Sequence, residues 1–129
     1  MATIVHAGGA EDEVFDGYTL LRCLIGAHLA GRSGDGGDGR FGLRNIDMTR
    51  IKSFNVTVNR TNGYDYIMVY KNDNPSNANN RIFFRQGNYG TPIEIDLTSV
   101  NPTDKKSLGI ECYCAGFTSL KINSVTKAE

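Results

Sequence analysis

The sequence predicts an all-β protein folded as a sandwich or a barrel, and three observations support this. The 129 residues include 15 glycines, no tryptophan and frequent Asn, Ser and Thr, which favours many turns over long helices. From Arg40 onward, short apolar-polar runs are separated by turn-forming residues. An apolar fraction of 40% suffices for one hydrophobic core in a chain of this length. We therefore expect one β-sandwich domain at 17–125, with an N-terminal arm at 1–16 and a C-terminal tail at 126–129.

The middle of the chain gives the clearest strand signals. Residues 51–58 alternate between apolar and polar side chains, which predicts a strand with one buried and one solvent-facing side. The pair Asn62-Gly63 follows and readily adopts positive φ angles, so it predicts a hairpin into the next strand at 64–71. Because that strand is apolar on both faces, we expect it at the centre of a sheet. The polar, proline-containing segment 72–80 predicts a surface loop.

The last third of the chain continues this pattern. Further strands are expected at 81–86, 93–97, 107–114 and 118–125. Gly116 lies between the last two and predicts a hairpin turn there.

The apolar run at 18–30 fits two patterns, and periodicity alone does not decide between them. A helical stripe would use Leu20, Leu21, Leu24, Ile25, His28 and Leu29, whereas a strand face would use Leu21, Cys23, Ile25, Ala27 and Leu29. Because Gly26 would cost a helix about 1 kcal/mol relative to alanine, we prefer the strand. One short N-terminal helix is the alternative. The glycine-rich segment that follows predicts a long hairpin loop that returns through residues 40–47.

The charge balance argues against nucleic acid and membrane partners. The chain has 14 basic and 14 acidic side chains, and its longest basic run is Lys105-Lys106, so it offers no cationic stripe for a row of phosphates. The longest apolar stretch, at 20–30, is shorter than the roughly 20 residues that span a bilayer. Residues 1–9 contain no cationic segment before an apolar one, so we expect no secretory signal and synthesis in the cytoplasm.

Two motifs suggest metal or nucleotide binding but lack the context for it. Residues 34–39 match the dinucleotide pattern G-x-G-x-x-G, yet no helix is expected after them to bind the pyrophosphate. Asp35 and Asp38 in this segment could instead bind calcium, which takes carboxylate ligands from flexible loops, although a mobile loop without a ligand is the preferred interpretation. Cys112 and Cys114 would point to one face of a strand, so we expect small core residues rather than a zinc site.

No arrangement of residues predicts catalysis. His6 and His28 are the only histidines, and neither lies beside a recognisable nucleophile. Glu94 and Asp96 are expected on the solvent-facing side of a strand. We therefore predict that the chain is not an enzyme and needs no cofactor.

A group of tyrosines among polar residues is the remaining distinctive feature. The candidate binding residues are Tyr64, Tyr66, Tyr70, Asn72, Asp73, Arg81, Arg85, Asn88 and Tyr89. An aromatic ring can stack on a sugar while Asn, Asp and Arg bind its hydroxyls. The same residues suit a protein interface, where Tyr and Arg are enriched, and tyrosines of a central strand often belong to the core. All three interpretations stay open, with the core first and the glycan last.

Three segments resemble the galactose-binding-like jelly-roll modules related to carbohydrate-binding modules. These segments are 45–58, 92–100, and 107–110 running on to 117–125. They are similar to an edge strand with the sequence Ile-Asp-Leu that leads into a core strand, and to a closing strand pair. The resemblance implies an antiparallel β-sandwich of jelly-roll type. Such modules also resemble accessory proteins of tailed bacteriophages, which decorate capsids or tails or touch the host envelope.

Together these observations predict a non-enzymatic binding or structural module. The first hypothesis is a virion component that decorates a phage capsid or tail through contacts with other virion proteins, and that forms a homo-oligomer. The alternative is a module that binds glycans of the bacterial surface through the tyrosine-rich loops.

Overall fold

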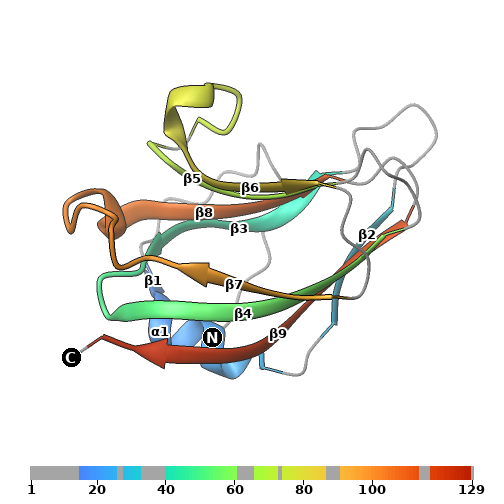
Figure 1. Ribbon diagram of the computed structural model, residues 1–129, viewed down its shortest axis with the longest axis horizontal. Helices are drawn as coiled ribbons and strands as arrows, with labels where there is room; N and C mark the ends of the chain where they lie inside the picture. Colours follow the sequence, from blue (N-terminus) through green and yellow to red (C-terminus); the bar gives the residue numbers. More distant parts are fainter. Residues whose placement is uncertain are drawn as a thin grey trace.

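Two β-sheets pack face to face in the computed structural model, which describes residues 15–25, 28–32, 40–60, 66–72, 74–86, 91–113 and 117–128 (Figure 1). Sheet A contains, in spatial order, β1 (Phe15–Asp16), β3 (Arg40–Asp47), β8 (Leu108–Tyr113), β5 (Tyr66–Lys71) and β6 (Arg81–Gln86). Sheet B contains β2 (His28–Arg32), β9 (Phe117–Lys127), β4 (Ile51–Arg60) and β7 (Pro92–Asp96). Between these described strands, all pairings are antiparallel except the short parallel one between β1 and β3. An isolated parallel bridge also joins Ile25 to Ile122. The predicted all-β sandwich is confirmed.

The order of the strands is that of a jelly roll. Apart from β1, the sheets have the orders β3-β8-β5-β6 and β2-β9-β4-β7, so successive strands from β2 onward alternate between the sheets except at β5 and β6. Two four-stranded sheets connected in this way make the double-sheet jelly roll. Only β5 and β6, among these described strands, are both consecutive in the chain and hydrogen-bonded to each other.

Three predicted hairpins are therefore wrong. Asn62-Gly63 lies between β4 and β5, Gly116 between β8 and β9, and the glycine-rich segment between β2 and β3, and each pair is divided between the two sheets. A turn signal indicates that the chain reverses but not which strand it pairs with. In a sandwich the reversal can pass from one sheet to the other, so that the apolar faces of both strands meet in the core.

The core lies between the sheets and follows the predicted alternation. Phe54, Val56 and Val58 on β4 are buried, as are Ile93 and Ile95 on β7. Leu108, Ile110 and Cys112 face them from β8, so the prediction of a core cysteine is confirmed for Cys112. Cys114 lies outside the described residues.

The preference for a strand at 18–30 is wrong for its first half. Residues Gly17–Cys23 form the helix α1, whose N-cap Asp16 accepts hydrogen bonds from the Tyr18 amide and the Thr19 hydroxyl, both at 3.1 Å. The buried side chains of α1 and its C-cap follow the helical stripe: they are Leu20, Leu21 and Leu24. Gly26 follows the helix, so it does not weaken it. Figure 1 shows α1 beside β1 and β9, and α1 belongs to the same core.

The end of the chain is more ordered than predicted. β9 extends to Lys127, which pairs with Ile51, and the Ala128 amide donates to the Arg50 carbonyl at 2.8 Å. The expected tail at 126–129 thus begins inside a strand. Pairing with β4 along most of its length makes β9 a central strand of sheet B.

Candidate binding face

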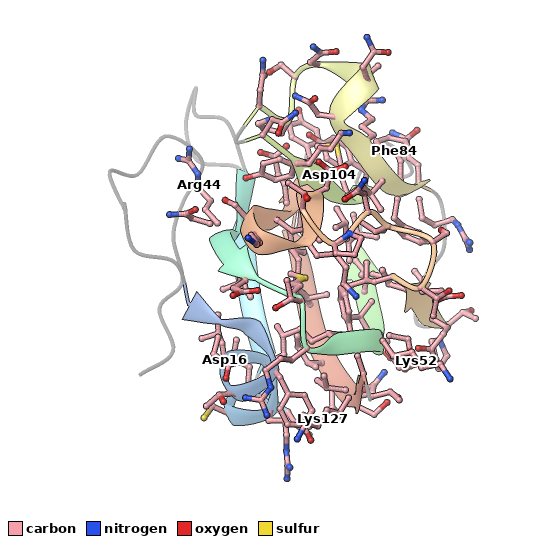
Figure 2. All side chains as sticks on the ribbon, turned by 90° about the vertical axis from the view of Figure 1, so that its left-hand side faces the viewer. Asp16, Arg44, Lys52, Phe84, Asp104 and Lys127 are labelled. Carbon is pink, nitrogen blue, oxygen red and sulfur yellow. The ribbon has the colours of Figure 1, made fainter. Side chains whose placement is uncertain are left out.

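The outer surface of sheet A carries a cluster of aromatic side chains. Ile67 and Val69 of β5 point into the core, so Tyr66, Met68 and Tyr70 point away from sheet B. The strand register sets Tyr113 of β8 opposite Tyr66, and it sets Glu111 of β8 and Phe84 of β6 on either side of Met68. We call the surface formed by Tyr66, Phe84, Glu111 and Tyr113 the aromatic face. Figure 2 shows Phe84 in the upper half of the molecule.

The rings of the aromatic face pack on one another. The Tyr66 and Tyr113 rings stack with centroids 5.4 Å apart and planes at 14°, while Phe84 lies 5.1 Å from Tyr66 at 37°. Since β5 lies between β8 and β6, the two neighbours flank the Tyr66 ring from opposite sides. The Arg81 guanidinium lies over the Phe84 ring, 4.8 Å from its centroid. Phe84 nevertheless stays 39% exposed, so it is the main apolar contact that this face offers.

A buried carboxylate positions the tyrosine at the centre of the cluster. Glu111 is only 4% exposed, and the Tyr66 hydroxyl donates a hydrogen bond of 2.8 Å to its Oε2 atom. Burying a carboxylate is costly unless hydrogen bonds compensate it, so this contact holds both side chains in place. The aromatic face therefore presents a preordered set of rings together with the Arg81 guanidinium, which are groups suited to binding.

The structure separates the predicted tyrosines. Tyr66 belongs to the aromatic face, whereas Tyr70, on the same side of the same strand, is 2% exposed. Its ring lies against Gly109 of β8, where a Cβ atom would come within 2.3 Å of the Tyr70 Cζ atom. The glycine thus leaves room for the ring against the sheet, and Tyr70 has almost no surface for a ligand.

The predicted polar residues have different roles. Arg81 and Arg85 are both exposed on the edge strand β6, but only Arg81 lies beside the aromatic face. Arg85 pairs with the inward-pointing Ile67, and its guanidinium lies over the Phe83 ring on the other side of β6. Asn72 has a positive φ of 62° and its Nδ2 atom donates to Asn80 Oδ1 at 3.3 Å, so it helps to hold the loop between β5 and β6. The other predicted site residues lie outside the described residues: Tyr64, Asp73, Asn88, Tyr89, Asp35 and Asp38.

Sequence reasoning missed Phe84, Glu111 and Tyr113 as parts of the site. The signal for the last two was present, because alternation in 107–114 puts Gly109, Glu111 and Tyr113 on the face opposite the apolar residues. An acidic residue in an otherwise apolar strand indicates either a functional group or a buried hydrogen bond.

A paired substitution tests the packing of Tyr70 on Gly109. We expect Gly109→Ala to lower the free energy of unfolding by about 1–3 kcal/mol, because the new methyl group overlaps the ring. In the background of Tyr70→Ala the same change should cost at least about 1 kcal/mol less, since the obstacle is gone. Urea denaturation of the two single variants and the double variant measures this coupling, and additive effects would contradict the contact.

The described part of the chain contains neither a metal-binding cluster of side chains nor a membrane-spanning helix. There, no three His, Cys, Asp or Glu side chains gather closely enough to hold a metal ion. No helix formed by the described residues is both long enough and apolar enough to cross a bilayer.

Comparisons of the sequence with protein-family models and with curated proteins give no match. The assignment as a jelly roll is based on the strand order of this chain. The likeness to galactose-binding-like modules stays a prediction from strand patterns.

Proposed function

We propose that this chain is a non-enzymatic β-sandwich module that acts by binding another protein through the aromatic face. The observation that carries the proposal is the 39% exposed Phe84 within a fixed cluster of rings, bordered by the exposed Arg81, whose guanidinium lies over the Phe84 ring. Protein interfaces are enriched in aromatic residues and arginine, and an exposed apolar side chain surrounded by polar groups is typical of them. The complementary partner surface would have an apolar centre and acidic side chains around it.

The packing of the rings favours a protein over a sugar as the partner. A sugar stacks on an open ring face, but Tyr66 is flanked by Tyr113 and Phe84, and Arg81 covers one face of Phe84. Aromatic rings packed in this way suit contact with side chains of another protein. The glycan-binding alternative therefore has less support from this face.

The biological setting that we propose is a phage particle, whose capsid or tail the module decorates. This part of the proposal is supported by the resemblance of the sequence to accessory proteins of tailed phages and by the jelly-roll fold. A fold alone does not define a function, so the setting needs its own test.

The test measures rebinding of the protein to particles. Particles released by the cells that carry this gene are first analysed by mass spectrometry for the chain, and are then stripped of it. We expect saturable rebinding of the wild type and at least about tenfold weaker rebinding of Phe84→Asp, because the variant puts a charge into the apolar contact. Ser124→Asp is the matched control, since it adds the same charge at an exposed position of β9 in sheet B.

Three outcomes would contradict the proposal. The first is absence of the chain from the particles, and the second is equal rebinding of Phe84→Asp and the wild type. The third is rebinding that free sugars abolish, which would indicate a glycan receptor instead. Circular dichroism of both variants verifies that they are folded.

A further inference from the structure

A cavity of about 450 Å³ lies at one end of the sandwich, far from the aromatic face. Its lining residues are Lys52, Thr98, Lys105, Thr126, Lys127 and Ala128, and we call it the lysine cavity. They come from the start of β4, the turn after β7, the 3-10 helix η2 (Asp104–Ser107) and the end of β9. Figure 2 shows Lys52 and Lys127 in the lower half of the molecule, away from Phe84.

Lys105 is an unusual residue in this cavity because it is only 8% exposed. Its Nζ atom donates a hydrogen bond of 2.7 Å to the Ile51 carbonyl, a neutral partner that leaves the charge uncompensated. Burial lowers the pKa of Lys105, and the nearby Asp96 carboxylate opposes this effect only in part. The ion pairs shown by the described residues, Arg50–Asp16 and Lys71–Asp104, do not involve Lys105.

Within the described part of the chain, the charges around the cavity leave it positive. Asp96 accepts a hydrogen bond of 2.9 Å from the Thr98 amide, and this bond, with Lys52 and Lys105 nearby, lowers its pKa. Asp96 is thus the one carboxylate that the described residues place beside the three lysines of the lining. The Lys127 Nζ atom lies 5.6 Å from the centre of the Tyr18 ring, which helps to fix its position.

We propose that the lysine cavity binds the phosphate group of a small organic phosphate. Lysines act as compact point charges with three rotatable donors, which suits a tetrahedral oxyanion, and the hydroxyl of Thr126 adds a neutral donor. The Thr98 hydroxyl is hydrogen-bonded to Asp96. Sites for small molecules usually have volumes of about 300–1,000 Å³, so this cavity has room for an organic group beyond a bare phosphate ion. The proposal does not depend on the function proposed for the aromatic face.

Isothermal titration calorimetry at low salt tests this site with glucose 6-phosphate, inorganic phosphate, sulfate and glucose as probes. We expect glucose 6-phosphate to bind more tightly than inorganic phosphate and sulfate, because its organic group fills more of the cavity, and we expect glucose to give no signal. The double variant Lys52→Gln/Lys127→Gln should weaken binding of glucose 6-phosphate at least about tenfold, because two of the three cations are lost. Lys106→Gln is the matched control, as it removes an exposed lysine adjacent to Lys105 that does not line the cavity.

The proposal is overturned if neither phosphate binds, if the double variant binds like the wild type, or if sulfate binds as tightly as glucose 6-phosphate. Lys105→Met is a further variant, with circular dichroism and denaturation to establish that it folds. We expect it to lose binding as well, and retention of full affinity would exclude Lys105 from the site.

Discussion

Replacing Phe54 with alanine is expected to lower the free energy of unfolding by about 3–5 kcal/mol. Phe54 is fully buried and is among the largest buried side chains of the described core. It lies on β4, between Ile95 of β7 and Val125 of β9 in the register of sheet B. Its removal leaves a cavity that the surrounding strands cannot close. Since single domains are typically stable by about 5–15 kcal/mol, the loss would be a large share of the total.

Urea denaturation followed by circular dichroism measures this loss. Phe84→Ala makes the same chemical change on the outside of sheet A, where the ring is 39% exposed, and should cost about 1 kcal/mol or less. Phe54→Leu keeps most of the volume and should cost less than about 2 kcal/mol. Equal losses for the alanine variants at positions 54 and 84 would mean that the core does not lie between the sheets as described.

Gly42→Ala is expected to cost about 3 kcal/mol, at the upper end of what an added methyl group costs in a packed interior. A Cβ atom on Gly42 would lie 1.8 Å from the Ile110 carbonyl oxygen and 3.1 Å from the Glu111 Cα atom. Both obstacles belong to the backbone of β8, so no side-chain rotation can relieve the overlap. The pairing of β3 with β8 would have to open at this point.

Amide hydrogen exchange localises the effect of Gly42→Ala. We expect faster exchange in β3 and β8, with little change in β4 and β7 of sheet B, together with the loss of stability in urea. Gly109→Ala is a useful comparison because its obstacle is the Tyr70 side chain rather than the backbone. A Gly42→Ala protein within about 0.5 kcal/mol of the wild type would contradict the close approach of the two strands.

The strands were predictable from the sequence, but their partners were not. The alternation of apolar and polar residues predicted the bounds of β4 and β7 nearly as observed, because each strand has one side in the core and one side in solvent. Asn62-Gly63 and Gly116 lie between strands that belong to different sheets, so neither predicted hairpin pairs within one sheet. The turn residues are the same whether a connection stays within one sheet or passes to the other. Which of the two occurs depends on apolar surfaces that are far away in the sequence.

The candidate site was likewise only partly predictable, because the sequence does not show which residues of the neighbouring strands lie beside each tyrosine. Tyr66 and Tyr70 are equivalent in the pattern of β5, and only the strand beside them distinguishes an accessible ring from a buried one. Tyr66 faces Tyr113, whereas Tyr70 faces Gly109. Glu111, the hydrogen-bond partner of Tyr66, is 45 residues away along the chain. Lys105-Lys106 looked uniform in sequence, but Lys105 is buried and Lys106 exposed.

The pairing of β4 with β9 has a consequence for how the protein is made. Asn123 of β9 donates hydrogen bonds to Asn55 and Thr57 of β4, with sequence separations of 68 and 66 residues. The middle of sheet B therefore cannot assemble until the ribosome has released residues 117–127. Contacts between residues so far apart in the sequence slow folding. Until β9 has been synthesised, the edge of β4 that will pair with it has no partner strand. Before β9 emerges, the unpaired edge of β4 raises the risk of aggregation with other chains.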